Sequence, residues 1–74
     1  MENLREIMSR VFDIDINTIN DELACDNTEE WDSFNHLLLI SEIEKEMDII
    51  FTISEVEQIK TFKVLREIIS KKYG

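Results

Sequence analysis

Residues 29–47, EEWDSFNHLLLISEIEKEM, are the stretch that decides how this chain folds. An acidic lead-in ends in an Asp-Ser pair, and an apolar run rich in helix-forming residues follows it. Aspartate is among the residue types that best accept hydrogen bonds from the first turn of a helix. We therefore predict a helix from Ser33 to about Met47, with Asp32 as its N-cap.

The predicted helix has two different sides when it is turned at about 100° per residue. The side that should face a core comprises His36, Leu39, Ile40, Ile43 and Met47, with Leu37 at its margin. Phe34 and Leu38 fall on the opposite side, among polar and charged residues. An exposed apolar pair with a charged rim has the anatomy of a docking surface. The alternative is that the loop before the helix folds over the pair.

The first helix is predicted upstream, over residues 2–13. Apolar residues recur there at helical spacing and form one stripe: Leu4, Ile7, Met8, Val11 and Phe12. The polar residues 14–32 then make a long loop for so small a chain. Because isolated apolar residues punctuate this loop, we expect it to be pinned across the core and to include a short helical turn. These residues are Ile14, Ile16, Ile19, Leu23, Cys25 and Trp31.

Two further helices are predicted downstream. Ser54 and Glu57 have the S-x-x-E spacing of a capping box and indicate a short helix. Val56 and Ile59 should point inward from it. Thr61 is a suitable cap for a last helix. The apolar stripe of that helix comprises Phe62, Leu65, Ile68 and Ile69, with Tyr73 at its end.

Together these elements predict an all-α fold in a single domain, residues 1–74. We expect a small four-helix bundle with three longer helices, one short helix and a long first loop. Residues 48–53, DIIFTI, are apolar enough for a strand, but no second strand is available to pair with them, so we predict a buried connector. The chain contains no proline, and its one glycine is the last residue, so turns must use Asn, Asp, Ser and Thr.

Counts of special residue types argue against several classes of protein. Cys25 is the only cysteine, so no disulfide can form within the chain, and one Cys with one His cannot make a Cys/His zinc site. No apolar run approaches the roughly 18–20 residues that span a bilayer. The opening MENLREIMSR lacks the basic-then-apolar order of a signal peptide. We expect a cytoplasmic monomer with a reduced thiol.

The formal net charge of −9 is unevenly distributed. Residues 21–57 contain twelve acidic side chains and a single base, Lys45, whereas residues 60–72 contain five bases and a single acid, Glu67. An acidic middle repels phosphate backbones, which argues against nucleic acid as a partner. It attracts basic protein surfaces and divalent cations. Solubility alone is the alternative explanation.

Ser33 can be understood in two ways from local chemistry. It is either a cap residue or a chemical handle, since the first-turn N–H groups of a helix favour an anion and would suit a phosphate on this hydroxyl. A hydrolase nucleophile is disfavoured. The sole histidine, His36, should face inward, and no glycine elbow or oxyanion site surrounds the serine.

Three segments taken together resemble a known family: DSF at a helix start, HLLLISEIEKEMDI after it, and ISEVEQIKTFKVLREII further on. They are similar to the acyl carrier proteins and the related peptidyl carrier domains, whose signature is Asp-Ser-Leu with the serine at the start of the second helix. The likeness covers the whole chain in helix order, length and acidity. The tripeptide alone is weakly specific.

The resemblance implies a non-enzymatic carrier. Ser33 would receive a 4′-phosphopantetheine group from coenzyme A through a separate phosphopantetheinyl transferase. The thiol of that arm would hold acyl or aminoacyl intermediates as thioesters for successive biosynthetic enzymes. Asp32 matches the aspartate of the motif and would help to position Mg²⁺ and the transferase. Enzymes with basic docking surfaces would contact Phe34, Leu37, Leu38, Ser41, Glu42, Glu44, Glu46, Asp48 and Glu57.

The chain departs from the family pattern near the serine. Phe34 stands where the signature usually has leucine, and Asn35 follows where many fatty-acid carriers have an acidic residue. Leu38 is apolar where they often carry glutamate. These departures favour a specialised pathway, such as one for secondary metabolites or cell-surface polysaccharides, over housekeeping fatty-acid synthesis.

Two other functions stay open. One is a small acidic helical adaptor that binds a basic partner without carrying a group, and the other is a carrier dedicated to an activated amino acid such as alanine. An enzyme is least favoured, because no pair of groups is arranged for catalysis. We interpret His36 as lining the core or contacting the loop, Cys25 as a small apolar plug, and Trp31 as packing the loop onto the second helix.

Overall fold

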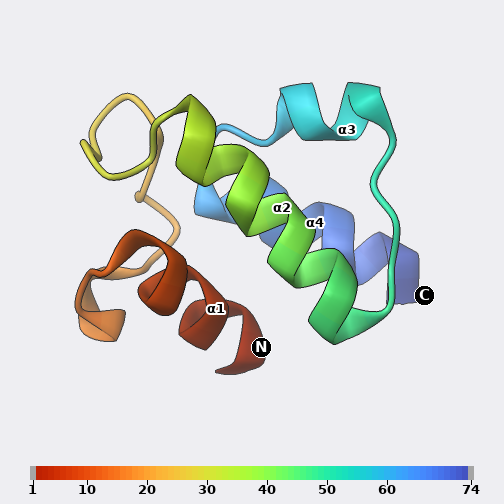
Figure 1. The fold of residues 1–74 in the computed structure, drawn as a ribbon, viewed down its shortest axis with the longest axis horizontal. Helices are drawn as coiled ribbons and strands as arrows, with labels where there is room; N and C mark the ends of the chain where they lie inside the picture. Colours follow the sequence, from red (N-terminus) through yellow and green to blue (C-terminus); the bar gives the residue numbers. More distant parts are fainter. Residues whose placement is uncertain (1, 74) are drawn as a thin grey trace.

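The computed structural model describes the backbone of residues 2–73 and the side chains of residues 4–72. Within that range four α-helices follow one another, with one 3-10 turn in the first loop (Figure 1). The elements are α1 (Glu2–Phe12), η1 (Ile16–Thr18), α2 (Ser33–Met47), α3 (Ile53–Gln58) and α4 (Phe62–Tyr73). The predicted all-α class, with three longer helices and one short one, is confirmed.

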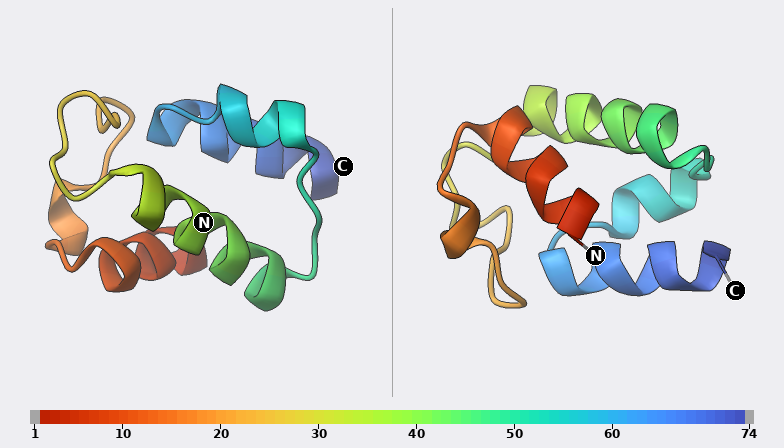
Figure 2. Two further views of the ribbon diagram at one scale, coloured as in Figure 1. Left: turned by 45° about the horizontal axis from the view of Figure 1, so that its top comes forward. Right: turned by 90° about the horizontal axis from the view of Figure 1, so that it is seen from below.

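The core lies where α1, α2 and α4 meet. In the right-hand view of Figure 2, α2 and α4 form opposite sides of the molecule, with α3 between them at one end. The predicted stripes supply most of the buried side chains: Leu4, Ile7, Met8 and Phe12 from α1, Leu39, Ile40 and Ile43 from α2, and Phe62, Leu65 and Ile69 from α4. Val11 and Ile68 are half-buried against them, and the side chain of Tyr73 lies outside the described residues.

The first loop is pinned to the bundle, as predicted. Ile19 and Trp31 are buried in the core, and the predicted helical turn is η1, which begins after its N-cap Asp15. Arg66 of α4 donates from one guanidinium nitrogen to both carboxylate oxygens of Asp21, each at 2.9 Å. The loop is therefore fixed by buried apolar anchors and by an ion pair with the last helix.

Backbone hydrogen bonds also connect the loop to the segment before α4. The N–H of Cys25 donates to the carbonyl of Lys60, and the N–H of Phe62 donates to the carbonyl of Leu23, both at 2.9 Å. These two bonds form an isolated antiparallel bridge. The bridge places Cys25 and Lys60 side by side, although 35 positions separate them in the sequence.

The start of α3 differs from the prediction by two residues. Its N-cap is Thr52, whose hydroxyl accepts from the N–H of Glu55 at 3.1 Å, while the Glu55 carboxylate accepts from the N–H of Thr52 at 2.9 Å. The box predicted at Ser54 and Glu57 is wrong. The Ser54 hydroxyl instead accepts from the side-chain amide of Gln58 at 3.1 Å. Both sites have the same residue spacing, and the earlier one is used because α3 begins at residue 53.

Residues 48–53 were predicted to be a buried connector, which is correct only in part. Phe51 is buried and Ile49 is half-buried, but Ile50 and Ile53 are 78% and 81% exposed. Successive side chains of extended backbone point to opposite sides, so Ile50 must face away when its neighbours face inward. Ile53 is the first residue of α3 and faces solvent there.

Candidate functional site

Ser33 is the first residue of α2, and its side chain is exposed. The capping role belongs to Asp32, whose carboxylate accepts from the N–H of Asn35 at 2.8 Å. The Asp32 carbonyl also accepts the first helical hydrogen bond, from the N–H of His36 at 2.8 Å. The Ser33 hydroxyl makes no hydrogen bond with another residue of the described chain. Ser33 is thus not the cap, and its oxygen is accessible.

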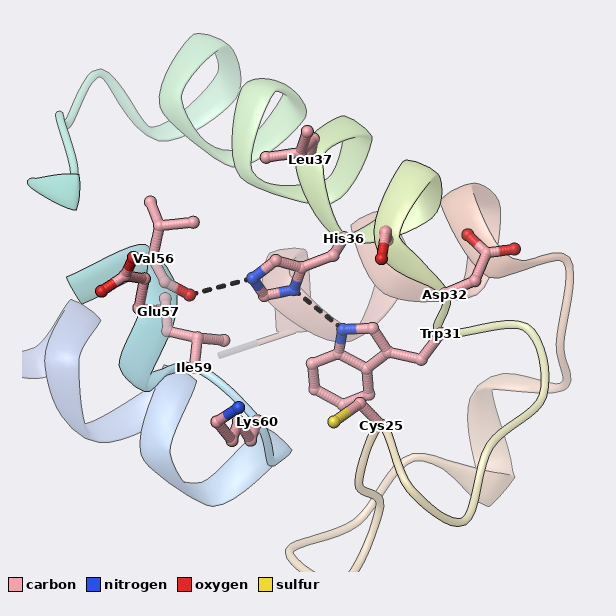
Figure 3. A pocket seen from close by; sticks show the side chains of 10 residues that line it. Cys25, Trp31, Asp32, His36, Leu37, Val56, Glu57, Ile59 and Lys60 are labelled. Atoms are coloured by element: carbon pink, nitrogen blue, oxygen red, sulfur yellow. Dashed lines mark hydrogen bonds between the residues drawn. The ribbon is translucent and has the colours of Figure 1, made fainter. Parts of the chain in front are cut away.

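Ser33 lines an open groove of about 750 Å³, whose other lining residues are labelled in Figure 3. Three parts of the chain meet there: the start of α2, the end of α3 with the connector that follows it, and the first loop. The lining residues are Ser33, His36 and Leu37 from α2, Val56, Glu57, Ile59 and Lys60 from the second part, and Cys25, Trp31 and Asp32 from the loop. The groove is therefore mostly apolar at its base and carries charged groups at its sides.

A chain of two hydrogen bonds, here called the Trp31–His36–Val56 bridge, crosses the base of the groove (Figure 3). The indole Nε1–H of Trp31 donates to Nδ1 of His36 at 3.0 Å, and His36 Nε2 lies 2.9 Å from the carbonyl oxygen of Val56. An indole can only donate and a carbonyl can only accept. The ring therefore carries its proton on Nε2 and is neutral in this arrangement.

The bridge confirms two interpretations made from the sequence. Trp31 is 3% exposed and packs against Phe12 of α1, with 5.3 Å between ring centroids, so it fixes the loop to the core. His36 is half-buried and contacts the loop through Trp31. The link to Val56 was not foreseen. It satisfies one of the last carbonyls of α3, which have no partner within a helix.

The apolar pair on the outer side of α2 is exposed. Phe34 and Leu38 are 74% and 39% exposed, so the alternative in which the loop covers them is wrong. Leu37 is also exposed and lies at the edge of the groove. Phe34, Leu37 and Leu38 together are called the apolar patch below. The patch and the Ser33 hydroxyl occupy the same end of α2.

The acidic residues further along α2 contact other parts of the same chain. Arg10 of α1 donates to Glu46 and, at 3.2 Å, to Glu42. The hydrogen bond with Glu46, and secondarily the contact with Glu42, raises the pKa of the Arg10 guanidinium above its ordinary value. The Glu44 carboxylate accepts from the N–H of Phe51 at 2.9 Å. These three carboxylates therefore stabilise the contacts of α2 with α1 and with the connector.

The remaining predicted contact residues are spread more widely. Ser41 and Asp48 are exposed on α2 and at its end, and Glu57 is exposed beside the groove. Asp48 terminates α2 in the left-handed conformation, with φ of 54°. Only Glu57 of these three lines the groove that contains Ser33.

Sequence reasoning missed the roles of three side chains that contact α2 or line the groove. Arg10 neutralises part of the acidic side of α2, and Lys60 lines the groove. Asn35 donates from its side-chain amide to the carbonyl of Glu30 at 2.8 Å, which ties the loop to the first turn of α2. Of these three contacts, only that of Asn35 could have been predicted from nearby residues, because an amide three residues after a cap can reach back to the preceding loop.

The exposed Ser33 hydroxyl lies near one imidazole, that of His36, which already has two hydrogen-bond partners. Both ring nitrogens of His36 are engaged in the bridge, so this histidine cannot take a proton from Ser33.

Within the described part of the chain, no group of three or more His, Cys, Asp or Glu side chains could hold a metal ion. None of the described helices combines the length and apolarity needed to cross a bilayer.

The fold is similar to that of a holo acyl carrier protein from Geobacter metallireducens, whose structure was solved in solution by NMR. The TM-score is 0.87 and the sequence identity is 29%, and the likeness covers 97% of this chain and 83% of that one. No family model matches the chain, and no curated protein matches it. The likeness therefore shows an acyl-carrier-like fold.

Proposed function

We propose that this protein is a carrier. It holds acyl or aminoacyl intermediates as thioesters on a 4′-phosphopantetheine arm attached to Ser33, and it presents them to successive biosynthetic enzymes. The observation that supports the proposal most strongly is the position of Ser33. Its hydroxyl is exposed at the first residue of α2, beside an open groove, in a fold similar to that of a holo acyl carrier protein.

The residues around Ser33 fit such an arm. The start of a helix favours a negative charge, so a phosphodiester on the first residue of α2 is stabilised by the local backbone. Ser33 lines the groove, whose volume of about 750 Å³ has room for a flexible substituent. Asp32 uses its carboxylate to accept from one backbone N–H, and a carboxylate has further lone pairs that can contact a divalent ion during modification.

Attachment forms one bond and breaks one. Ser33 Oγ bonds to the phosphorus that carries the pantetheine of coenzyme A, the P–O bond of the pyrophosphate breaks, and adenosine 3′,5′-bisphosphate leaves. The serine proton passes to a base of the transferase or to solvent, because His36 is occupied in the bridge. When bound, the arm supplies the thiol that forms the thioester with the cargo.

Partner enzymes are expected to contact the apolar patch first. Phe34 projects at the same end of α2 as Ser33, so an enzyme that reaches the arm also reaches this ring. Glu42 and Glu46 already interact with Arg10 and offer less net charge to a basic surface than the sequence suggested. The transferase and the loading and transfer enzymes would thus bind through apolar contact, with charge in a secondary role.

Intact-mass analysis tests the proposal. The purified protein is incubated with coenzyme A, Mg²⁺ and a promiscuous phosphopantetheinyl transferase, and we expect a gain of one phosphopantetheine per chain. Ser33→Ala should abolish the gain, while Ser70→Ala, which changes an exposed serine on α4, should not. A wild-type chain that remains unmodified would contradict the proposal and favour the adaptor alternative.

A further inference from the structure

We infer that the groove beside Ser33 binds the distal end of the arm with its cargo, and that the Trp31–His36–Val56 bridge confines this site to short acyl groups with a polar or charged substituent. The inference rests on the proposed function. It adds the class of cargo and the residues that select it.

The attachment point and the groove belong to one surface feature. Ser33 lines the groove, so a substituent on its hydroxyl can bend back over α2 and reach the base of the groove without leaving the protein. The volume of about 750 Å³ is within the range of roughly 300–1,000 Å³ that small-molecule sites occupy. A bound arm is then held beside the apolar patch, where a partner enzyme would approach.

The base of the groove is also the outer wall of the core. Trp31 and Ile59 line the groove, yet both are almost completely buried and belong to the hydrophobic core. Figure 3 shows the His36 ring extending from α2 toward the Val56 carbonyl on α3. A cargo that lies in the groove is therefore separated from the interior by these side chains and by the bridge.

The bridge makes entry of a long alkyl chain unfavourable. Passage between α2 and α3 would separate His36 from the Val56 carbonyl or from the Trp31 indole. Separation from Trp31 leaves the indole N–H of a side chain that is only 3% exposed without an acceptor, which costs free energy because little water reaches it. The Val56 carbonyl would also lose the partner that replaces its missing helical hydrogen bond. An apolar chain would thus stay in the open groove, partly in water.

The sides of the groove favour a polar cargo instead. Glu57 at the end of α3 and Lys60 in the following connector are exposed beside it, and neither forms an ion pair with another described residue. A carboxylate on the cargo can pair with Lys60, and an amino group can pair with Glu57. A short acyl group with such a substituent gains a contact that an alkyl chain does not make.

Trp31 provides the readout, because it is the only tryptophan and its indole N–H is part of the bridge. The protein is loaded by the transferase from coenzyme A, succinyl coenzyme A or octanoyl coenzyme A, and intact mass confirms each product. We expect the succinyl form to shift the NMR resonances of the Trp31 indole and the Lys60 amide relative to the unacylated form. The octanoyl form should leave the core methyl groups of Ile43 and Leu65 unshifted.

Two results would overturn the inference. One is an octanoyl form in which the methyl resonances of Ile43 or Leu65 shift, which would mean that the chain enters the core. The other is a succinyl form with unchanged groove resonances, which would mean that the arm stays in solvent. Failure of the proposed function is distinguishable from both, because the mass would then show no arm at all.

Two variants test the selection itself. Trp31→Phe retains an aromatic ring but removes the indole donor, and we expect octanoyl loading to shift the core methyl groups only in this variant. Lys60→Gln should reduce the shift caused by the succinyl group at the Trp31 indole toward that of the unacylated form. Lys63→Gln, which changes an exposed lysine on α4 that does not line the groove, is the matched control and should change neither result. If octanoyl loading has the same effect on the core methyl resonances in the wild type and in Trp31→Phe, the bridge does not select the cargo and the inference is overturned.

Discussion

The two ends of α2 differ in what their side chains contact. At the first two turns Phe34 and Leu38 face solvent, and the Ser33 hydroxyl has no partner within the described residues. At the last turns the carboxylates contact other parts of the chain: Glu46 pairs with Arg10 and Glu44 accepts from the backbone of the connector. One helix therefore has an open end, which the proposed function makes the place of modification and docking, and a fixed end, where its contacts stabilise the fold.

This contrast changes the interpretation of the acidic charge. An acidic helix invites the view that its carboxylates exist to attract basic partners. In this structure Glu42, Glu44 and Glu46 all have intramolecular hydrogen bonds. The large apolar side chains that are exposed on α2, Phe34, Leu37 and Leu38, lie near Ser33 instead. The exposed apolar side chains and the carboxylates that contact the rest of the chain thus lie at different ends of the same helix.

The largest effect on stability should appear when a phenylalanine is replaced by alanine at the fixed end and, in a separate variant, at the open end. Phe51, beside the fixed end, is 7% exposed, and Phe34, at the open end, is 74% exposed. We expect Phe51→Ala to lower the free energy of unfolding by about 3–5 kcal/mol, because it leaves a cavity in the core. Phe34→Ala should change it by no more than about 0.5 kcal/mol. Urea unfolding followed by circular dichroism measures both, and equal losses would contradict the contrast.

Substitutions at the open end should lower the rate of modification by the transferase more than substitutions at the fixed end. We expect the double variant Phe34→Ala with Leu38→Ala to lower kcat/KM of the transferase roughly 5- to 30-fold, as loss of about 1–2 kcal/mol of interface contact would do. Glu46→Gln removes one exposed charge that Arg10 already neutralises, so its effect should be below about 3-fold.

Steady-state assays at one ionic strength provide this comparison, with intact mass as the detection method. The unfolding curves of the variants show whether they are folded. A larger loss in Glu46→Gln than in the double variant would mean that acidic attraction governs docking after all.

The sequence predicted α2 and its two sides well because the signals were local. Asp32 is a strong cap type, and the helical period placed Leu39 and Ile43 inward and Phe34 outward. His36 was placed inward by the same period. The open end of the helix was therefore largely predictable.

The fixed end was not predictable in the same way. Arg10 meets Glu46 across 36 positions, and no spacing rule links residues on different helices. Residues 52–55 and 54–57 both have the pattern of a capping box, so the register of α3 depends on which neighbours become buried. Lys60 reaches the groove only because the loop pairs with the segment before α4. These contacts depend on tertiary structure.

A smaller effect on stability is expected at Asp48, where α2 ends. Asp48 has φ of 54°, in the left-handed region that is unfavourable for a residue with a Cβ atom. We expect Asp48→Gly to be more stable than Asp48→Ala by about 1 kcal/mol, since both remove the carboxylate and only glycine adopts this conformation freely. Thermal unfolding of the pair measures the difference. Equal stability would mean that the backbone relaxes at this position.

The smallest effect concerns the charge that fixes α3 to α4. Glu55 pairs with Lys72 at 2.7 Å, and the hydrogen bond with Lys72, followed by that with the Thr52 backbone, lowers the pKa of the Glu55 carboxyl below its ordinary value of 4.5. A lowered pKa in the folded state stabilises the protein above pH 4.5, and this contribution is lost as the pH falls through the folded-state pKa.

Glu55→Gln separates the charge from the cap, because glutamine can still accept from the N–H of Thr52. We expect the wild type to melt at a higher temperature than Glu55→Gln near neutral pH, and the difference to shrink as the pH is lowered below 4.5. In a Lys72→Met background, where the first cause of the lowered pKa is absent, the pH dependence of that difference should be weaker. A difference in melting temperature that is constant from neutral to acidic pH would show that the ion pair adds nothing beyond the cap, and that α3 is held to α4 by apolar contact alone.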